Sequence, residues 1–147
     1  MSKALDLIAQ CKASGDWSPL VGAIPYARFL GLSIEHQPAG LVCKMSFSDH
    51  LIGNPVLPAL HGGTLGALLE STAIFQLMWE SKTVLLPKTI NITVDYLRSG
   101  RPVDTYARGI ITKHGRRVMN VRAEAWQEDP ARPIATATAH FLVVAPS

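Results

Sequence analysis

The chain has 147 residues, of which 48% are hydrophobic and 17% charged, and its formal net charge is +3. This length and apolar content fit one domain spanning residues 1–147. No stretch reaches the roughly 18 uninterrupted apolar residues of a membrane span, and residues 1–13 lack a secretory signal, so we expect a cytoplasmic protein with no membrane partner. The two cysteines, Cys11 and Cys43, form no disulfide or zinc pattern, and we expect both to be reduced.

The first 29 residues (1–29) are predicted to form a helical extension that packs on the main body. Ser2 is expected to cap a helix that runs to about Ser14, where a glycine follows. The pair Ser18-Pro19 is typical of the cap and first position of a short second helical turn.

Alternating apolar residues then predict two strands, at residues 30–34 and 41–47, joined by a turn at 38–40. A loop rich in glycine and proline follows at residues 48–60. From residue 62 to about 82 the chain is almost wholly apolar or small. We predict a helix there, and a helix that is apolar on nearly every side belongs in the middle of a structure.

The rest of the chain is predicted to be strand. Residues alternate between apolar and polar over 89–96, 119–125 and 135–143, a further strand is expected at 104–112, and 113–116 is expected to be the hairpin turn after it. The inward positions of the last two strands are mostly alanine, which leaves room for a helix across the sheet. The sequence therefore predicts an α+β fold in which an antiparallel sheet wraps around one long central helix.

The segment LHGGTLGALLEST, residues 60–72, resembles the HGG-x-x-x-x-L-x-(Asp/Glu) signature of hotdog-fold acyl-CoA thioesterases of the PaaI-like group. The segments VDYLR at 94–98 and GRR at 115–117 resemble that family as well. The resemblance implies a hotdog fold and hydrolysis of an acyl-CoA to free CoA and a carboxylic acid. It implies no cofactor other than the coenzyme A that is part of the substrate.

The first residues of the central helix fit this chemistry. A helix N-terminus stabilises the negative charge that develops on a thioester oxygen under attack, and the Gly62 N–H is the expected donor. Glycine at this position, and at Gly63, lets the substrate approach the backbone, and a buried helix has no other evident need for two glycines at its entrance. Glu70 is expected to be a buried general base or a nucleophile. The alternative is a structural carboxylate paired with an arginine.

Helix geometry points to two chains at each site. Gly62 and Glu70 are eight residues apart, which is about 12 Å along a helix axis, too far for both to act on one carbonyl carbon. We therefore expect a homodimer with antiparallel helices, in which Gly62 of one subunit faces Glu70 of the other. Whether two such dimers associate into a homotetramer stays open.

The resemblance implies further site residues. His61 would hold the oxyanion loop, the alternative being a histidine satisfied by backbone groups. Asn54 lies in the loop where many family members carry a water-placing amide, although counting from His61 puts that amide on Pro55. Thr89 aligns with a hydroxyl that some relatives use, and an ordinary strand threonine is the alternative. The other histidines lack ligand spacing, so no metal site is predicted.

Seven of the fourteen Lys and Arg residues lie between Arg98 and Arg122, and this segment is predicted to create a local positive field. A solvated strand face is the alternative. Nucleic acid is not expected as a partner, because only Tyr106 is interleaved as a stacking aromatic. Five residues are the candidates for binding the phosphates of CoA: Arg98, Arg101, Lys113, Arg116 and Arg117. A non-hydrolytic acyl-CoA binding or sensing protein is the alternative function, and a hydratase or dehydratase is disfavoured.

Overall fold

The computed structural model describes residues 3–84 and 86–143. The outermost residues of the predicted domain, including the predicted cap Ser2, lie outside these ranges. The elements, in chain order, are α1 (Lys3–Ser14), α2 (Ser18–Ala23), α3 (Pro25–Leu30), β1 (Leu32–Gln37), β2 (Gly40–Met45), η1 (Asp49–Leu51), β3 (Ile52–Asn54), β4 (Ala59–Leu60), α4 (Gly62–Glu80), β5 (Lys88–Tyr96), β6 (Thr105–His114), β7 (Val118–Trp126) and β8 (Ala135–Leu142).

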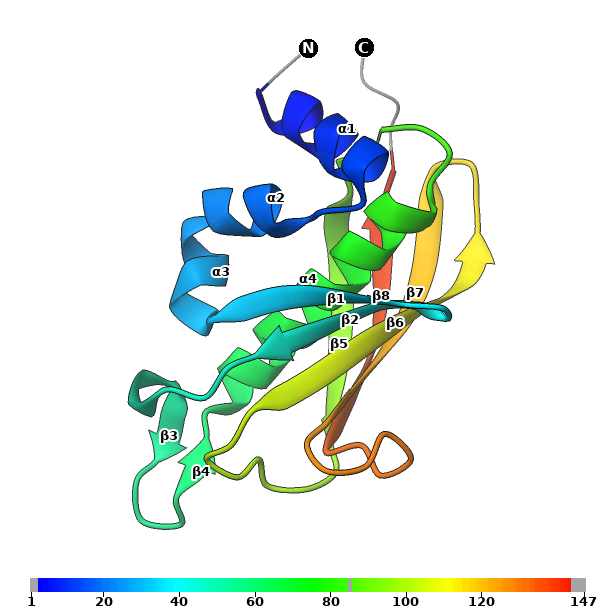
Figure 1. Cartoon of the computed structure of the whole chain (residues 1–147). Coiled ribbons are helices and arrows are strands. Elements are labelled where there is room, and N and C mark those ends of the chain that lie inside the picture. Colours follow the sequence, from blue (N-terminus) through cyan, green and yellow to red (C-terminus); the bar gives the residue numbers. More distant parts are fainter. Residues whose placement is uncertain (1–2, 85, 144–147) are drawn as a thin grey trace.

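Six strands form one antiparallel sheet in the order β1-β2-β6-β7-β8-β5. The sheet is strongly curved and wraps around α4 (Figure 1). Small side chains let the helix lie close to the sheet, and the alanines on this face of the last three strands in the chain are at most 3% exposed: Ala107, Ala123, Ala125, Ala135, Ala137 and Ala139. The predicted α+β architecture around one central helix is confirmed.

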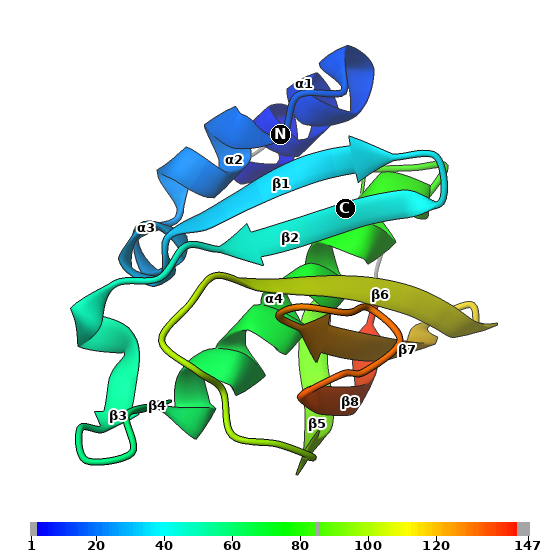
Figure 2. The same ribbon diagram turned by 60° about the horizontal axis from the view of Figure 1, so that its bottom comes forward.

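The structure departs from the predicted elements mainly before α4. The expected strand at 30–34 begins two residues later, because Leu30 ends a helix, α3, that the sequence analysis missed. Gly31 follows with a φ of 70°, the left-handed conformation that terminates helices. The expected loop at 48–60 contains a short hairpin, β3–β4, and Figure 2 shows it beside the N-terminal end of α4.

The first N-terminal helix, α1, packs at the other end of the central helix. Ile8, Cys11 and Trp17 are buried in the same core as the residues of α4. The Lys12 ammonium donates hydrogen bonds to the carbonyl oxygens of Met78 (2.6 Å) and Ser81, where α4 ends. A cation there complements the negative end of the helix dipole. No helix in the described ranges has the length and apolar character needed to cross a membrane.

Candidate functional site

His61 organises the start of α4. It is the N-cap residue, and its Nδ1 accepts a hydrogen bond from the Gly63 N–H at 2.9 Å. Its own N–H donates to the Leu51 carbonyl at 2.8 Å, and its carbonyl accepts from the Thr64 N–H at 3.0 Å. Because Nδ1 accepts this hydrogen bond, only Nε2 is left to act as the donor of the imidazole. His61 therefore joins the preceding loop to the first turn of the helix.

The two glycines at this turn have packing roles that the sequence analysis missed. A Cβ on Gly62 would lie 3.3 Å from atoms of the Tyr96 ring, and a Cβ on Gly63 would lie 2.9 Å from the His61 Nδ1. A larger residue at either position would require the Tyr96 ring or the His61 imidazole to shift. The expectation that a buried helix has no other need for two glycines at its entrance was wrong.

The Gly62 N–H is nevertheless free. Within the described ranges no group accepts a hydrogen bond from it, whereas the N–H of Gly63 is taken up by His61. Gly62 is the first residue of a 19-residue helix, whose positive dipole end it occupies. The arrangement can therefore donate one backbone hydrogen bond to an anion or a developing oxyanion.

A hollow opens beside this amide. It has a volume of about 380 Å³, and its lining includes Gly62, Leu65, Tyr96 and Leu97. Arg98 and Ser99 also line it, and the same two residues line a second hollow of about 470 Å³. The second hollow contains three arginines, Arg98, Arg101 and Arg132, together with Glu128 and Asp129. The hollow at Gly62 therefore borders a second hollow that is lined by arginine side chains.

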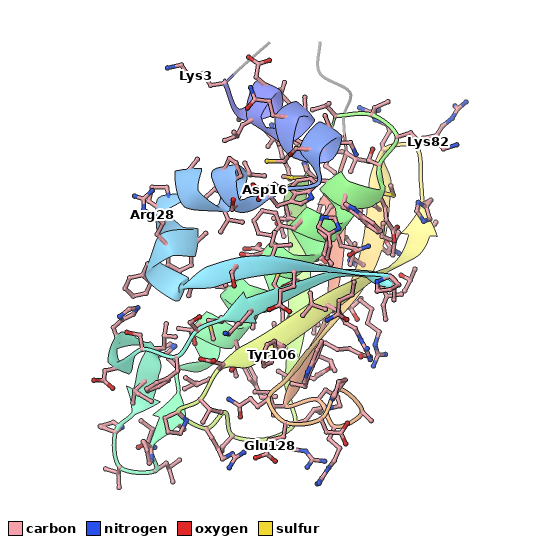
Figure 3. All side chains as sticks on the ribbon, in the orientation of Figure 1. Lys3, Asp16, Arg28, Lys82, Tyr106 and Glu128 are labelled. Atoms are coloured by element: carbon pink, nitrogen blue, oxygen red, sulfur yellow. The ribbon has the colours of Figure 1, made fainter. Side chains whose placement is uncertain are left out.

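A larger cavity lies elsewhere, mainly on the face of the sheet that points away from α4, although Gln76 of α4 also lines it. It has a volume of about 640 Å³, and neither Gly62 nor Glu70 lines it. Its walls include Tyr106 and Trp126, whose rings stack with centroids 6.1 Å apart, and Glu128. Figure 3 shows Tyr106 on β6 and Glu128 on the loop that follows β7. Its size alone does not make it the site, because Gly62, whose N–H is free, lines the smaller hollow and not this cavity.

Glu70 is only half-buried, which differs from the prediction of a buried acid. It lies on a stripe along α4 that the sheet leaves partly open, together with Gly63, Gly66, Ala67, Ser71 and Ile74. β5 is the last strand of the sheet, and no other strand of the described ranges pairs with its outer edge, which leaves the stripe open on that side. Among the described residues no ion pair or hydrogen bond involves the Glu70 carboxylate, so the alternative of an arginine partner finds no support there.

Two other predicted site residues serve local structure. Asn54 ends β3, and its Oδ1 accepts hydrogen bonds from the N–H groups of Val56 (3.0 Å) and Leu57 (3.3 Å). Such an Asx turn closes the β3–β4 hairpin. Thr89 is half-buried in β5, opposite Phe141 of β8. Within the described ranges neither residue is hydrogen-bonded to Gly62 or Glu70.

The basic segment does not form one positive surface, contrary to the prediction. Lys113, Arg116 and Arg117 lie at the β6–β7 turn, whereas Arg98 and Arg101 precede the other end of β6. Ten strand residues span about 30 Å, so the two groups lie at opposite ends of the sheet. Three other contacts neutralise part of the charge: Arg108 with Glu124 (3.2 Å), Arg122 with Glu124 (3.4 Å) and Arg101 with Glu128.

Two residues of the site were not predicted. Tyr96 packs on Gly62, and its hydroxyl donates to the Gly62 carbonyl at 2.8 Å. Arg132 joins Arg98 and Arg101 in the second hollow. The VDYLR segment resembled a known family, but its alternation marked Tyr96 only as an inward strand residue. Arg132 lies in the loop between β7 and β8. Nothing in the sequence indicated that it lies next to Arg98 and Arg101.

Comparisons with known proteins identify the family of the chain. The thioesterase superfamily matches residues 57–134. The medium/long-chain acyl-CoA thioesterase YigI of Salmonella typhimurium is 28% identical over 82% of this chain and 86% of its own. A solved structure from Chromobacterium violaceum is 38% identical, with a TM-score of 0.76 and coverage of 92% of this chain and 94% of that one.

A second solved structure, a phenylacetic acid degradation-related protein from Ralstonia eutropha JMP134, is 26% identical. It covers 86% of this chain and 98% of its own, with a TM-score of 0.72. The predictions of a hotdog fold and of a thioesterase are therefore confirmed. The chain belongs to the thioesterase superfamily.

Proposed function

We propose that the protein is an acyl-CoA thioesterase that hydrolyses the thioester to free CoA and a carboxylic acid. One observation carries the proposal: α4 carries both the free Gly62 N–H, at its positive end, and the Glu70 carboxylate, which has no hydrogen-bond or ion-pair partner among the described residues. A donor for an oxyanion and a carboxylate for water are the two groups that thioester hydrolysis requires. The name of the YigI relative supports an acyl-CoA substrate of medium or long chain.

In the proposed mechanism the thioester carbonyl oxygen accepts a hydrogen bond from the Gly62 N–H. Glu70 removes a proton from water while the water oxygen bonds to the carbonyl carbon, and the resulting oxyanion is stabilised by the same amide. The C–S bond then breaks, and the CoA sulfur leaves and receives the proton from Glu70. Direct attack by the Glu70 carboxylate, through a transient anhydride that water then hydrolyses, is the variant of this scheme.

The proposal includes a homodimer with two equivalent sites. Gly62 and Glu70 are separated by about 12 Å along α4, so one copy cannot bring both to one carbonyl carbon. Among the described strands the nine-residue edge strand β5 pairs only with β8, and its Ile90, at the register shift between Thr89 and Asn91, is 53% exposed. An open strand edge beside an uncovered helix stripe favours a second copy across a two-fold axis.

The proposed place for the CoA phosphates is the group formed by Arg98, Arg101 and Arg132. These guanidinium groups lie beyond the hollow at Gly62 and suit bidentate contact with phosphate oxygens. Lys113, Arg116 and Arg117 lie at the far end of β6 in the same chain, so they reach the ligand only if the partner subunit or a dimer of dimers brings them to it.

The proposal names no cofactor beyond the CoA of the substrate. It places the protein in the cytoplasm, in keeping with two buried free cysteines, Cys11 and Cys43, of the kind that a reducing compartment preserves.

The decisive experiment measures CoA release from acetyl-, octanoyl-, palmitoyl- and phenylacetyl-CoA. We expect steady turnover by the wild type on at least one of them and a fall of about two decades or more in Glu70→Gln. Glu35→Gln is the matched control, because Glu35 is an exposed carboxylate on β1. Equal rates for wild type and Glu70→Gln would contradict the proposed role of Glu70.

A second function, non-hydrolytic acyl-CoA binding or sensing, is favoured by one observation. The Asn54 side-chain oxygen already accepts hydrogen bonds from two N–H groups of its own hairpin, so it is not available to position a water molecule. Calorimetry separates the two functions. Acyl-CoA binding without CoA release across the whole panel would replace the enzyme with a binding protein.

A further inference from the structure

Tyr96 connects the edge strand of the sheet to the start of the central helix. It is the last residue of β5 and stands opposite Ala135 of β8. Its side chain is 55% exposed, yet its hydroxyl donates to the Gly62 carbonyl at 2.8 Å. The two positions are 34 residues apart in the sequence, so this is a tertiary contact, and it holds the helix turn whose N–H is free.

The ring of Tyr96 adds a steric constraint to this hydrogen bond. A Cβ on Gly62 would lie 3.3 Å from two ring carbons and from the hydroxyl oxygen of Tyr96, and one on Gly66 would lie 3.7 Å from that oxygen. Glycine has the widest backbone freedom of any residue. The Tyr96 ring packed against Gly62 therefore restricts the orientations that the peptide groups of Gly62 can adopt. The ring thus lies against the first turn of α4 on the side that opens into the hollow at Gly62.

The position of Tyr96 is itself fixed by the sheet. The N–H groups of the two residues after it, Leu97 and Arg98, both donate to the Ile134 carbonyl, at 2.8 and 3.0 Å. The strand therefore cannot slide along β8 without breaking these bonds, and the phenol is held from a rigid base.

We propose that Tyr96 is a positioning residue for thioester hydrolysis: its hydroxyl and ring fix the first turn of α4 so that the Gly62 N–H already points at the carbonyl oxygen. This inference rests on the proposed function. Oxyanion donors are effective because they are oriented before the charge develops. The hydroxyl of Tyr96 donates its hydrogen bond to the Gly62 carbonyl. Tyr96 therefore acts through Gly62 and takes no part in proton transfer.

Tyr96→Phe tests this, because it keeps the ring and removes only the hydrogen bond. Removal of a whole oxyanion donor lowers kcat by about 10²–10³, so loss of a bond that orients the donor is expected to lower kcat by about tenfold. KM should stay within about twofold, because the ring still lines the hollow beside Gly62. Tyr106→Phe is the control, since Tyr106 lies on the far face of the sheet, and it should leave kcat unchanged.

A purely structural role for Tyr96 predicts a different pattern, namely a lower melting temperature with an unchanged kcat per folded molecule. Thermal unfolding of both variants is therefore measured beside the kinetics. If the wild type is active and Tyr96→Phe has the same kcat, the proposed role of Tyr96 is overturned and the thioesterase proposal stays intact. A wild type that releases no CoA from any substrate would overturn the proposed function, and this role with it.

Discussion

The imidazole of His61 closes the first turn of α4 by accepting the Gly63 N–H at 2.9 Å. His61→Ala leaves that N–H without a partner and is expected to lower the free energy of unfolding by about 1 kcal/mol and to reduce kcat. His61→Asn supplies a side-chain oxygen that caps helices well, so it should retain most of the stability and activity. Urea unfolding and steady-state kinetics measure both. An equal loss of kcat in the two variants would instead assign the imidazole a chemical role.

The other end of α4 depends on Lys12, whose ammonium donates to the Met78 and Ser81 carbonyls. Burial lowers the pKa of Lys12, and the hydrogen bonds to carbonyl oxygens hold the charged form in place. Lys12→Met is expected to reduce the free energy of unfolding by about 1–2 kcal/mol, without changing kcat per folded molecule. Lys3→Met serves as the control, because Lys3 is exposed at the start of α1. Identical melting of the two variants would contradict the capping role.

Both cysteines are expected to be inert in the native protein, which matters for any assay that detects released CoA with a thiol reagent. Cys11 and Cys43 are at most 1% exposed, and burial raises the pKa of the Cys43 thiol from 9.0 to about 12. We expect no thiol to react in the native state at pH 8 and two to react in urea. Rapid labelling of the native protein would contradict the burial of both side chains.

The same shift in the Cys43 pKa makes stability depend on pH. A thiol whose pKa is raised by folding contributes stability that is fully present below the unfolded value of 9.0 and is lost as pH rises toward 12. The free energy of unfolding should therefore fall between pH 9 and pH 10, and the slope should be smaller in Cys43→Ala. Urea titrations at each pH measure the slope of both proteins.

The two separated groups of basic residues give a prediction about CoA recognition. Arg98→Ala and Arg132→Ala are expected to raise KM for acyl-CoA by about tenfold, since each loses a charge-assisted contact with phosphate, while Lys113→Ala has a smaller effect. An acyl-pantetheine substrate lacks the nucleotide phosphates and should be hydrolysed equally by all four proteins. A larger KM effect from Lys113→Ala would place the phosphates at the opposite end of β6.

The sequence predicted the architecture because the central helix and the strands differ in hydrophobic period. Each of these features can be recognised within a short stretch of sequence: the polar–apolar alternation of β5, β7 and β8, the alanines on the strands, and the apolar helix. The free Gly62 N–H also agrees with the expected donor, since the HGG turn opens the helix at the predicted residue.

Properties that depend on the order of the strands in the sheet could not be predicted from such local sequence patterns. Glu70 is half-buried because β5 is the edge strand, a fact that no local pattern contains. The contact of Tyr96 with Gly62 joins positions 34 residues apart and depends on the curvature of the sheet. The division of the basic residues could have been foreseen, because the ten-residue strand β6 keeps its two ends about 30 Å apart.

A site shared between two subunits predicts a result that a site within one chain cannot give. If each site takes Gly62 from one subunit and Glu70 from the other, a subunit carrying Gly62→Pro and one carrying Glu70→Gln are each inactive as homodimers, yet together form one intact site per mixed dimer. Random mixing makes half of the dimers mixed, so activity should recover to about a quarter of the wild-type value. Co-refolding of differently tagged variants, with purification through both tags, raises this to about a half. A mixture that stays inactive although mixed dimers are isolated would place both residues of each site in one chain.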